Sequence, residues 1–163
     1  MVVEKVLGEG AAVLVMETAE SAQERGGPVL ADVLGYGMSM DAVGFLEPAL
    51  DSAGLVHAIE MALERSEVAA DEVGLVVWAP QGNAQDRKVL QALAAVLPQH
   101  ESVPLVTTTF NTGYIESASI LVSLATTLRA LSTGTQLWPQ RTGMAELDSR
   151  ALTARPKYVL ACG

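Results

Sequence analysis

The turn from Thr107 to Tyr114 holds the side chains of this chain that are best placed to do chemistry. It joins a β-branched stretch, Pro104 to Thr109, to the most apolar helical stretch of the chain, Ile115 to Leu131. A turn at the carboxyl end of a buried strand is where α/β proteins bind ligands and display catalytic groups. This turn contains Asn111 and Tyr114 but no histidine, lysine or cysteine. Its chemistry is therefore confined to hydrogen bonding.

Three further candidates lie elsewhere in the chain. His57 sits beside the apolar stripe of a predicted helix without a second ligand at metal-binding spacing, so it is interpreted as an ordinary surface or boundary histidine. Cys162, the single cysteine, excludes an internal disulfide and fits a reducing, cytoplasmic setting. The Gly8-Glu-Gly10 stretch is rejected as a phosphate cradle, because it precedes an apolar strand and not a helix N-terminus. The residues predict no cofactor and no metal.

The elements that must position these residues alternate between strand and helix. Strands are predicted at Gly10 to Met16, Pro28 to Met40, Val73 to Ala79, Pro104 to Thr109 and Lys157 to Ala161. Helices are predicted from Thr18 to Arg25, after a cap at Asp51 or Ser52, in the stretch that ends at Pro98, and from Ile115 to Leu131. This order indicates an α/β fold with a mostly parallel sheet.

The apolar positions of the three longer helices recur at helical spacing, and those of the helix before Pro98 are expected to face inward. They are Leu55, Ile59, Ala62 and Leu63 in the first, Val89, Leu90, Leu93, Ala94 and Leu97 in the second, and Leu121, Leu124, Ala125, Leu128 and Leu131 in the third. The third helix also has Ile115, Ala118, Ile120 and Val122, so it is apolar nearly all round. A helix of this kind is buried, often against its equivalent from another layer. Loops are predicted at Val43 to Ala49 and Ser132 to Asp148.

Composition bounds the class of protein. The chain has 163 residues, 50% of them hydrophobic, which is enough for the core of one domain. A net charge of -9 argues against a nucleic-acid or anionic-membrane surface. No signal peptide is predicted at the N-terminus, and the 115–131 stretch is too polar to span a membrane.

Three segments together resemble the β-ketoacyl synthases, which have the thiolase fold. They are Val6-Leu-Gly-Glu-Gly-Ala-Ala-Val-Leu-Val-Met-Glu17, Arg25-Gly-Gly-Pro-Val-Leu-Ala-Asp-Val-Leu-Gly-Tyr-Gly-Met-Ser-Met-Asp-Ala42, and the strand, turn and helix from Pro104 to Leu131. The resemblance covers only the later part of a synthase. It implies a thiolase-like layered α/β fold, incomplete on its own, in which residues 1–163 form one C-terminal domain: 1–42 close the missing N-terminal half, and 43–163 are the C-terminal half.

The resemblance also implies which catalytic groups should be present. A condensing synthase of this family uses two histidines and a lysine, and its nucleophilic cysteine belongs to the absent first part. The first histidine position holds Pro80, which has no side-chain donor and no N–H. The second holds Tyr114, and Phe110 or Asn111 stands where the lysine would be. No catalytic residue is therefore expected, although the Tyr114 hydroxyl can still donate a hydrogen bond.

Loss of these donors on a kept scaffold is the pattern of the chain length factor, the ketosynthase-like subunit of type II polyketide synthases. The resemblance implies a non-catalytic protein, not an enzyme by itself, that pairs with a ketosynthase subunit and with a complementary synthase-like polypeptide, and acyl carrier protein is a further partner. Nucleic acid and membrane are not among the expected partners. Surfaces near the partner or the product tunnel are expected at Asp41 to Leu50 and Phe110 to Tyr114.

Two other interpretations remain open from the sequence. In one, the chain is the second half of a split, active ketosynthase with unusual donors. In the other, two copies pair their sheets to form a homodimeric scaffold. Both ends of the predicted sheet lack a closing partner, and unpaired sheet edges are normally covered by something else.

Overall fold

A computed structural model describes residues 6–40, 51–135 and 155–163. Within them a parallel sheet is formed by β1 (Val73–Trp78), β2 (Leu105–Val106) and β3 (Tyr158–Cys162), in the order β2-β1-β3. β1 is the central strand. Val76 aligns with Leu105 on one side and with Leu160 on the other. The predicted α/β class and parallel sheet are confirmed.

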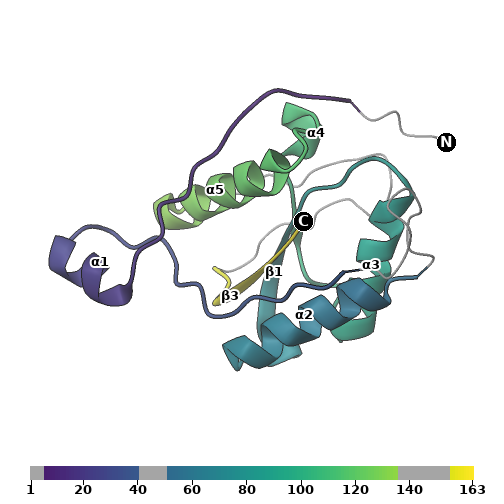
Figure 1. Cartoon of the computed structure of the whole chain (residues 1–163), viewed down its shortest axis with the longest axis horizontal. Coiled ribbons are helices and arrows are strands. Elements are labelled where there is room, and N and C mark those ends of the chain that lie inside the picture. Colours follow the sequence, from purple (N-terminus) through teal and green to yellow (C-terminus); the bar gives the residue numbers. More distant parts are fainter. Residues whose placement is uncertain (1–5, 41–50, 136–154) are drawn as a thin grey trace.

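Helices cover both faces of this sheet (Figure 1). α2 (Ala53–Ser66) and α3 (Ala84–Val96) lie together on one face, and α5 (Ala118–Thr133) lies on the other. Two short helices complete the described part of the chain, α1 (Ala19–Arg25) and α4 (Thr109–Thr112), with a 3-10 turn at Ala70–Glu72. Because both faces of β1 are covered by helices, its sequence is a continuous apolar run.

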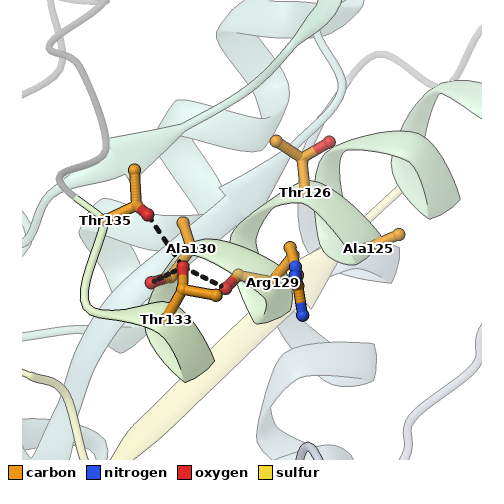
Figure 2. A pocket seen from close by; sticks show the side chains of 6 residues that line it. All are labelled: Ala125, Thr126, Arg129, Ala130, Thr133 and Thr135. Atoms are coloured by element: carbon orange, nitrogen blue, oxygen red, sulfur yellow. Dashed lines mark hydrogen bonds between the residues drawn. The ribbon is translucent and has the colours of Figure 1, made fainter.

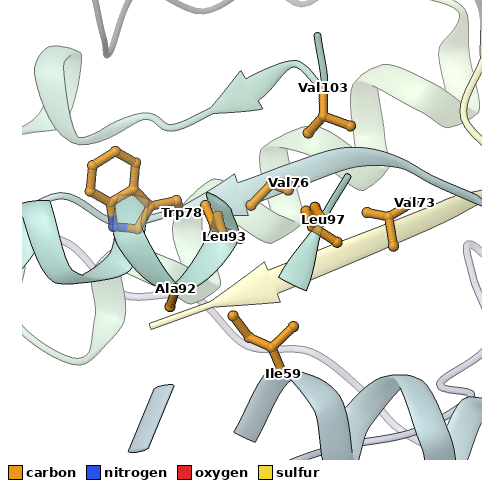
Figure 3. Close-up of a cluster of buried hydrophobic side chains, with 8 residues drawn as sticks. All are labelled: Ile59, Val73, Val76, Trp78, Ala92, Leu93, Leu97 and Val103. Atoms are coloured by element: carbon orange, nitrogen blue, oxygen red, sulfur yellow. The ribbon is translucent and has the colours of Figure 1, made fainter. Parts of the chain in front are cut away.

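The main core lies between β1 and the α2/α3 pair (Figure 3). Val76 and Trp78 point from the strand toward Leu93 of α3 and Ile59 of α2. Because successive strand residues face opposite sides, Leu75 and Val77 face α5, and both are fully buried. The strand predicted at Val73 to Ala79 is confirmed, one residue shorter.

Two predicted strands are wrong. Residues 10–16 and 28–40 are neither strand nor helix, and most of their apolar side chains are exposed. A strand requires a neighbour to accept its backbone hydrogen bonds, and the described part of the chain offers none to these segments. The helix between them is present: the Thr18 hydroxyl accepts from Ser21 N at 3.2 Å, and Gly26 ends the helix at φ 62°.

The helix predicted before Pro98 is present, and its predicted inward face is wrong at one residue. Ala94 is exposed, whereas Ala92 is completely buried between α3 and the sheet. His57 of α2 is exposed, as its interpretation required.

The apolar stripe of the last predicted helix is not the face that the helix buries most deeply. α5 begins at Ala118, three residues later than predicted, and the side chains it buries are Ser119, Ser123, Thr127 and Ala130. Leu121 is 37% exposed. The buried hydroxyls find local partners: Ser119 Oγ accepts from Ile115 N at 2.7 Å, and Thr127 Oγ1 donates to the Ser123 carbonyl at 2.8 Å. Small side chains let the helix approach the sheet closely, and these bonds remove the cost of burying their polar atoms.

The predicted strand Pro104 to Thr109 is shorter in the structure. Thr107 Oγ1 accepts from Thr109 N at 3.0 Å, which turns the chain into α4 directly after β2. The predicted loops at 43–49 and 136–148 lie outside the described residues, as does the expected partner surface at 41–50. α5 extends to Thr133, into the start of the predicted irregular stretch.

Candidate functional site

The turns that follow β1 and β2 open on the same edge of the sheet, because the strands are parallel. Pro80 begins the first turn and Tyr114 ends the second. Asp86 lies close enough to Tyr114 for its carboxylate to raise the pKa of the phenol. The sequence-predicted positions are thus brought to one edge by two separate strands.

Asp86 organises the turn after β1. Its carboxylate accepts from Gln81 N at 2.8 Å and from Gly82 N at 2.7 Å, with a longer bond from Asn83 N at 3.3 Å. The side chain is buried. Three consecutive amides therefore bind an internal carboxylate, and none of them is aimed outward at a ligand.

Asn83 completes this arrangement by starting α3. Its side-chain oxygen accepts from Gln85 N at 2.8 Å, and Asp86 three residues later reaches back to the amide of Asn83. This reciprocal pair is a capping box. The sequence interpretation missed Asp86, although the Asn-x-x-Asp spacing before a helical stretch is the signal that could have revealed it.

Pro80 is fully buried at the end of β1. It has no N–H to donate, and its side chain has no polar atom. The position where the family resemblance expects the first catalytic histidine is therefore held by a buried apolar residue.

The turn after β2 is held by hydroxyl groups. Thr108 N donates to Ser123 Oγ at 3.0 Å, which ties the turn to α5, and the Thr107 and Thr109 hydroxyls are 3.0 Å apart. Phe110 and Asn111 lie on α4 with exposed side chains. These two positions face solvent.

Tyr114 is partly buried after Gly113, whose φ of 75° suits glycine. Burial raises the pKa of its phenol first, and the carboxylates of Glu116 and Asp86 raise it further. The neutral phenol is the form favoured at this edge, so the group can act as a hydrogen-bond donor but is a poor base.

The N-terminal segment crosses the second turn at Gly8. Gly8 N donates to the Tyr114 carbonyl at 3.1 Å, and Tyr114 N donates to the Val6 carbonyl at 2.7 Å. A Cβ atom at Gly8 would overlap the Thr112 carbonyl oxygen. This close backbone approach explains the glycine at position 8 and fixes the backbone of Tyr114.

Cys162 lies at the carboxyl end of β3 and packs on the main core. Burial raises the pKa of its thiol to about 12. A thiol that stays protonated at neutral pH is a poor nucleophile. Its environment gives no support to a nucleophilic role.

The rest of the described chain offers no alternative centre of chemistry. Within residues 6–40, 51–135 and 155–163, no group of three His, Cys, Asp or Glu side chains could hold a metal ion. No helix in these ranges is long and apolar enough to cross a membrane.

An open groove lies along the C-terminal part of α5, and Figure 2 shows its lining, which includes Arg129 and Thr133. The Thr133 hydroxyl already bonds to the Arg129 carbonyl and to Thr135 Oγ1.

Comparison with known proteins gives the site its context. Residues 30–142 match the family described as beta-ketoacyl synthase, C-terminal domain. A chloroplastic 3-oxoacyl-[acyl-carrier-protein] synthase II of Arabidopsis thaliana is 33% identical over 130 residues, which are 79% of this chain and 24% of that protein. The chain thus spans about a quarter of the length of this relative.

Solved structures agree with the fold. A type II PKS acyl-carrier protein in complex with its ketosynthase bound to the hexaketide superposes on 89% of this chain and 38% of the matched chain, with a TM-score of 0.75 and 18% identity. The ishigamide ketosynthase/chain length factor superposes on 95% of this chain and 36% of the matched chain, with a TM-score of 0.71 and 26% identity. The predicted thiolase-like architecture, present in part, is confirmed.

Proposed function

Since the chain belongs to the β-ketoacyl synthase family, as a C-terminal portion of such a protein, we propose that it is a non-catalytic subunit of the chain-length-factor kind. It pairs with a ketosynthase and with a complementary N-terminal polypeptide in type II polyketide or fatty-acid-like biosynthesis. Acyl carrier protein is the proposed carrier of the substrate, and the cytoplasm is the proposed setting.

The observation that carries this proposal is the state of the sheet edge where the strands end. Stabilising an enolate or an oxyanion requires donors aimed at the reacting oxygen. At this edge Pro80 offers no donor, and the amides of residues 81–83 are already bound to Asp86. Phe110 and Asn111 face solvent. The positions 80–83, 110 and 111 therefore offer no donor aimed at a reacting oxygen.

The ishigamide ketosynthase/chain length factor supports the choice of class, because that solved assembly contains a subunit of the proposed kind. The matched chain of that assembly superposes on 95% of this one, with 26% identity.

A specific observation favours one alternative function. The neutral Tyr114 phenol at the sheet edge could donate to a thioester oxygen, which would make the chain part of a split, active ketosynthase. The two functions differ in what Tyr114→Phe does, because phenylalanine keeps the ring and removes only the donor.

The deciding experiment is condensation of acyl and malonyl carrier-protein thioesters by the assembled complex. We expect Tyr114→Phe to leave turnover within about twofold, whereas loss of a donor in an oxyanion site costs roughly a hundredfold or more. Thr112→Val serves as the matched control, since it removes a nearby hydroxyl that bonds to the Thr108 carbonyl at 3.1 Å. A large, Tyr114-specific loss of turnover would establish the enzyme and refute the non-catalytic subunit.

A further inference from the structure

The ammonium group of Lys88 is enclosed by the protein. Its Nζ atom has essentially no surface open to solvent, and within residues 6–40, 51–135 and 155–163 no acceptor forms a hydrogen bond with it. An ammonium has three N–H donors and a full charge, and lysine is almost never fully buried unless it is paired. The charge of Lys88 therefore lacks a counterpart in the described part of the chain.

The other lysines and arginines that the structure describes are paired, in contact with a ring, or exposed. Arg65 Nη1 donates to the Tyr36 carbonyl at 3.0 Å, in the stretch 35–39 that lies on α2. The Lys157 ammonium lies 4.6 Å from the centre of the Tyr158 ring. The arginines that pair with a carboxylate or have exposed side chains are Arg25, Arg87, Arg129 and Arg155.

The carboxylates at the starts of the neighbouring helices already have partners. Asp86, two residues before Lys88, accepts from three backbone amides of the turn after β1. Asp51, just before α2, accepts from Ala53 N at 3.1 Å. The chain has 19 acidic residues, yet none of the described ones forms an ion pair with Lys88. The missing counterpart is thus not explained by a shortage of carboxylates.

The position of Lys88 on α3 leaves a route to its ammonium. Lys88 lies four residues before Ala92, so the two side chains leave the helix on the same face. Ala92 is completely buried and belongs to the core that includes Ile59 of α2 (Figure 3). Lys88 as a whole is only partly buried. Because its four-carbon stem is flexible, a small movement brings the ammonium to the surface without opening the core.

We propose that Lys88 binds a small oxyanion, a phosphate or a carboxylate group, near the start of α3. A buried ammonium without a partner is unfavourable, and an anionic oxygen that accepts its hydrogen bonds removes this cost. A phosphate or a carboxylate offers several oxygens to the three N–H donors, which a chloride ion does not. Arg87, exposed beside Lys88, adds positive charge to the approach. The inference is independent of the proposed function.

Thermal unfolding of the full chain tests the proposal. Sodium phosphate is added up to about 50 mM while sodium chloride keeps the ionic strength constant, and sodium acetate is the parallel series. We expect the Tm of the wild-type chain to rise and then level off, because a ligand that binds the folded state stabilises it. Lys88→Met keeps an apolar stem and removes the charge, so it should weaken the affinity about tenfold or more. Arg87→Met, at the exposed neighbour, is the control and should keep the affinity within about threefold.

A second measurement needs no variant. In the wild-type chain labelled with 15N-lysine, the Lys88 ammonium signal should shift with phosphate or acetate at the concentrations that raise the Tm. The Lys157 ammonium, in contact with the Tyr158 ring, should not shift. In buffer without either anion, Lys88→Met should unfold at the same or a higher temperature than the wild-type chain, because an apolar side chain replaces a buried unpaired cation.

Three results would overturn the inference. The first is equal stabilisation of the wild-type chain and Lys88→Met by phosphate and by acetate. The second is a wild-type chain that responds to these anions no more than to chloride. The third is a Lys88→Met chain that unfolds at a clearly lower temperature in buffer without either anion, since the ammonium would then have a partner within the protein. A Lys88-dependent response to acetate alone would support the site and identify its ligand as a carboxylate.

Discussion

Asp86 shows how a single residue can decide the chemistry of a loop. Its carboxylate satisfies three consecutive amides that would otherwise point toward the sheet edge. The same residue also starts α3 through the reciprocal bond with Asn83. Stability and the absence of outward donors in this loop therefore have one common cause.

The first prediction concerns this carboxylate. Asp86→Asn replaces one acceptor oxygen with an NH2 group that faces backbone N–H donors, so we expect the free energy of unfolding to fall by about 1–3 kcal/mol. Denaturant unfolding measures the change. Asp71→Asn, at an exposed residue of the 3-10 turn, is the control and should change stability by less than about 0.5 kcal/mol. Equal effects of the two substitutions would contradict the role given to Asp86.

Cys162 predicts a pH dependence at the same scale. Burial raises the pKa of its thiol to about 12 in the folded chain, against 9.0 for an unperturbed cysteine. Between these values the unfolded chain releases a proton that the folded chain keeps, so the free energy of unfolding decreases as pH rises from about 9 to about 12. Below pH 9 the contribution is constant.

Comparison with Cys162→Ala isolates this effect from other groups that titrate at alkaline pH. We expect the wild-type chain to lose more stability than the variant as the pH increases, measured by denaturant unfolding over the same pH steps. Parallel pH profiles for the two proteins would show that the thiol is not held in its neutral form.

At the scale of elements, α5 packs on the sheet through a stripe of small residues, Ser119, Ser123, Thr127 and Ala130, at spacings of four and three. Ser123 is completely buried and bonds to Thr108 N, so the helix also holds the turn after β2. The larger apolar side chains are displaced to the flanks. A helix this apolar can therefore face its own sheet with its most polar stripe.

Ser123→Leu tests this packing. Adding a branched side chain where none fits should destabilise the chain by about 1–3 kcal/mol and loosen the turn after β2. Thr126→Leu, on the exposed side of the same helix, introduces the same leucine without the steric conflict and should be close to neutral. Thermal unfolding distinguishes the two, and a neutral Ser123→Leu would contradict the close approach.

The contact between residues 35–39 and α2 gives a second prediction at this scale. Gly37→Val should force residues 35–39 off the helix, because the new Cβ would overlap the Ala58 carbonyl. Amide exchange at residues 35–39 and the fluorescence of Tyr36 would report the release. Ala31→Val, in an exposed part of the same segment, is the control. Unchanged exchange in Gly37→Val would show that the glycine is not required there.

The order of the elements could be predicted from the sequence, because it depends on local signals. The apolar run at 73–79 and the stop at Pro98 predicted β1 and the end of α3. The inward face of α5 could not be predicted from hydrophobicity, since hydrophobicity ranks leucine above serine and says nothing of how closely a helix approaches its sheet. The two N-terminal strands failed for another reason: pairing depends on a neighbour that the described chain does not contain.

The residues of the site also fall into those that could be found from the sequence and those that could not. Pro80 and Tyr114 were picked out by resemblance, and the structure brings their turns to one edge. Asp86 was missed because its role depends on burial and on three amides of a loop, which residue type alone does not reveal.

For the whole molecule, charge predicts how the partner is found. The chain carries a net charge of -9, and residues 6–40 share in the excess of acidic groups. If the surface that the proposed ketosynthase partner presents is basic, association should slow about tenfold or more from low to high ionic strength, while dissociation changes little.

Surface plasmon resonance at several salt concentrations would measure both rates. Glu20→Gln and Glu24→Gln together should reduce the salt dependence of association, since they remove two negative charges from α1. An association rate indifferent to salt would mean that apolar contacts alone guide the encounter.

The crossing at Gly8 has a consequence for the time course of folding. It pairs Gly8 with Tyr114, which lies 106 positions later in the chain. Contacts between such distant residues form late, because the intervening chain must be ordered first. During synthesis residues 6–16 are therefore made well before Tyr114 and dock on it among the last, so their apolar side chains stay open to a chaperone for much of synthesis.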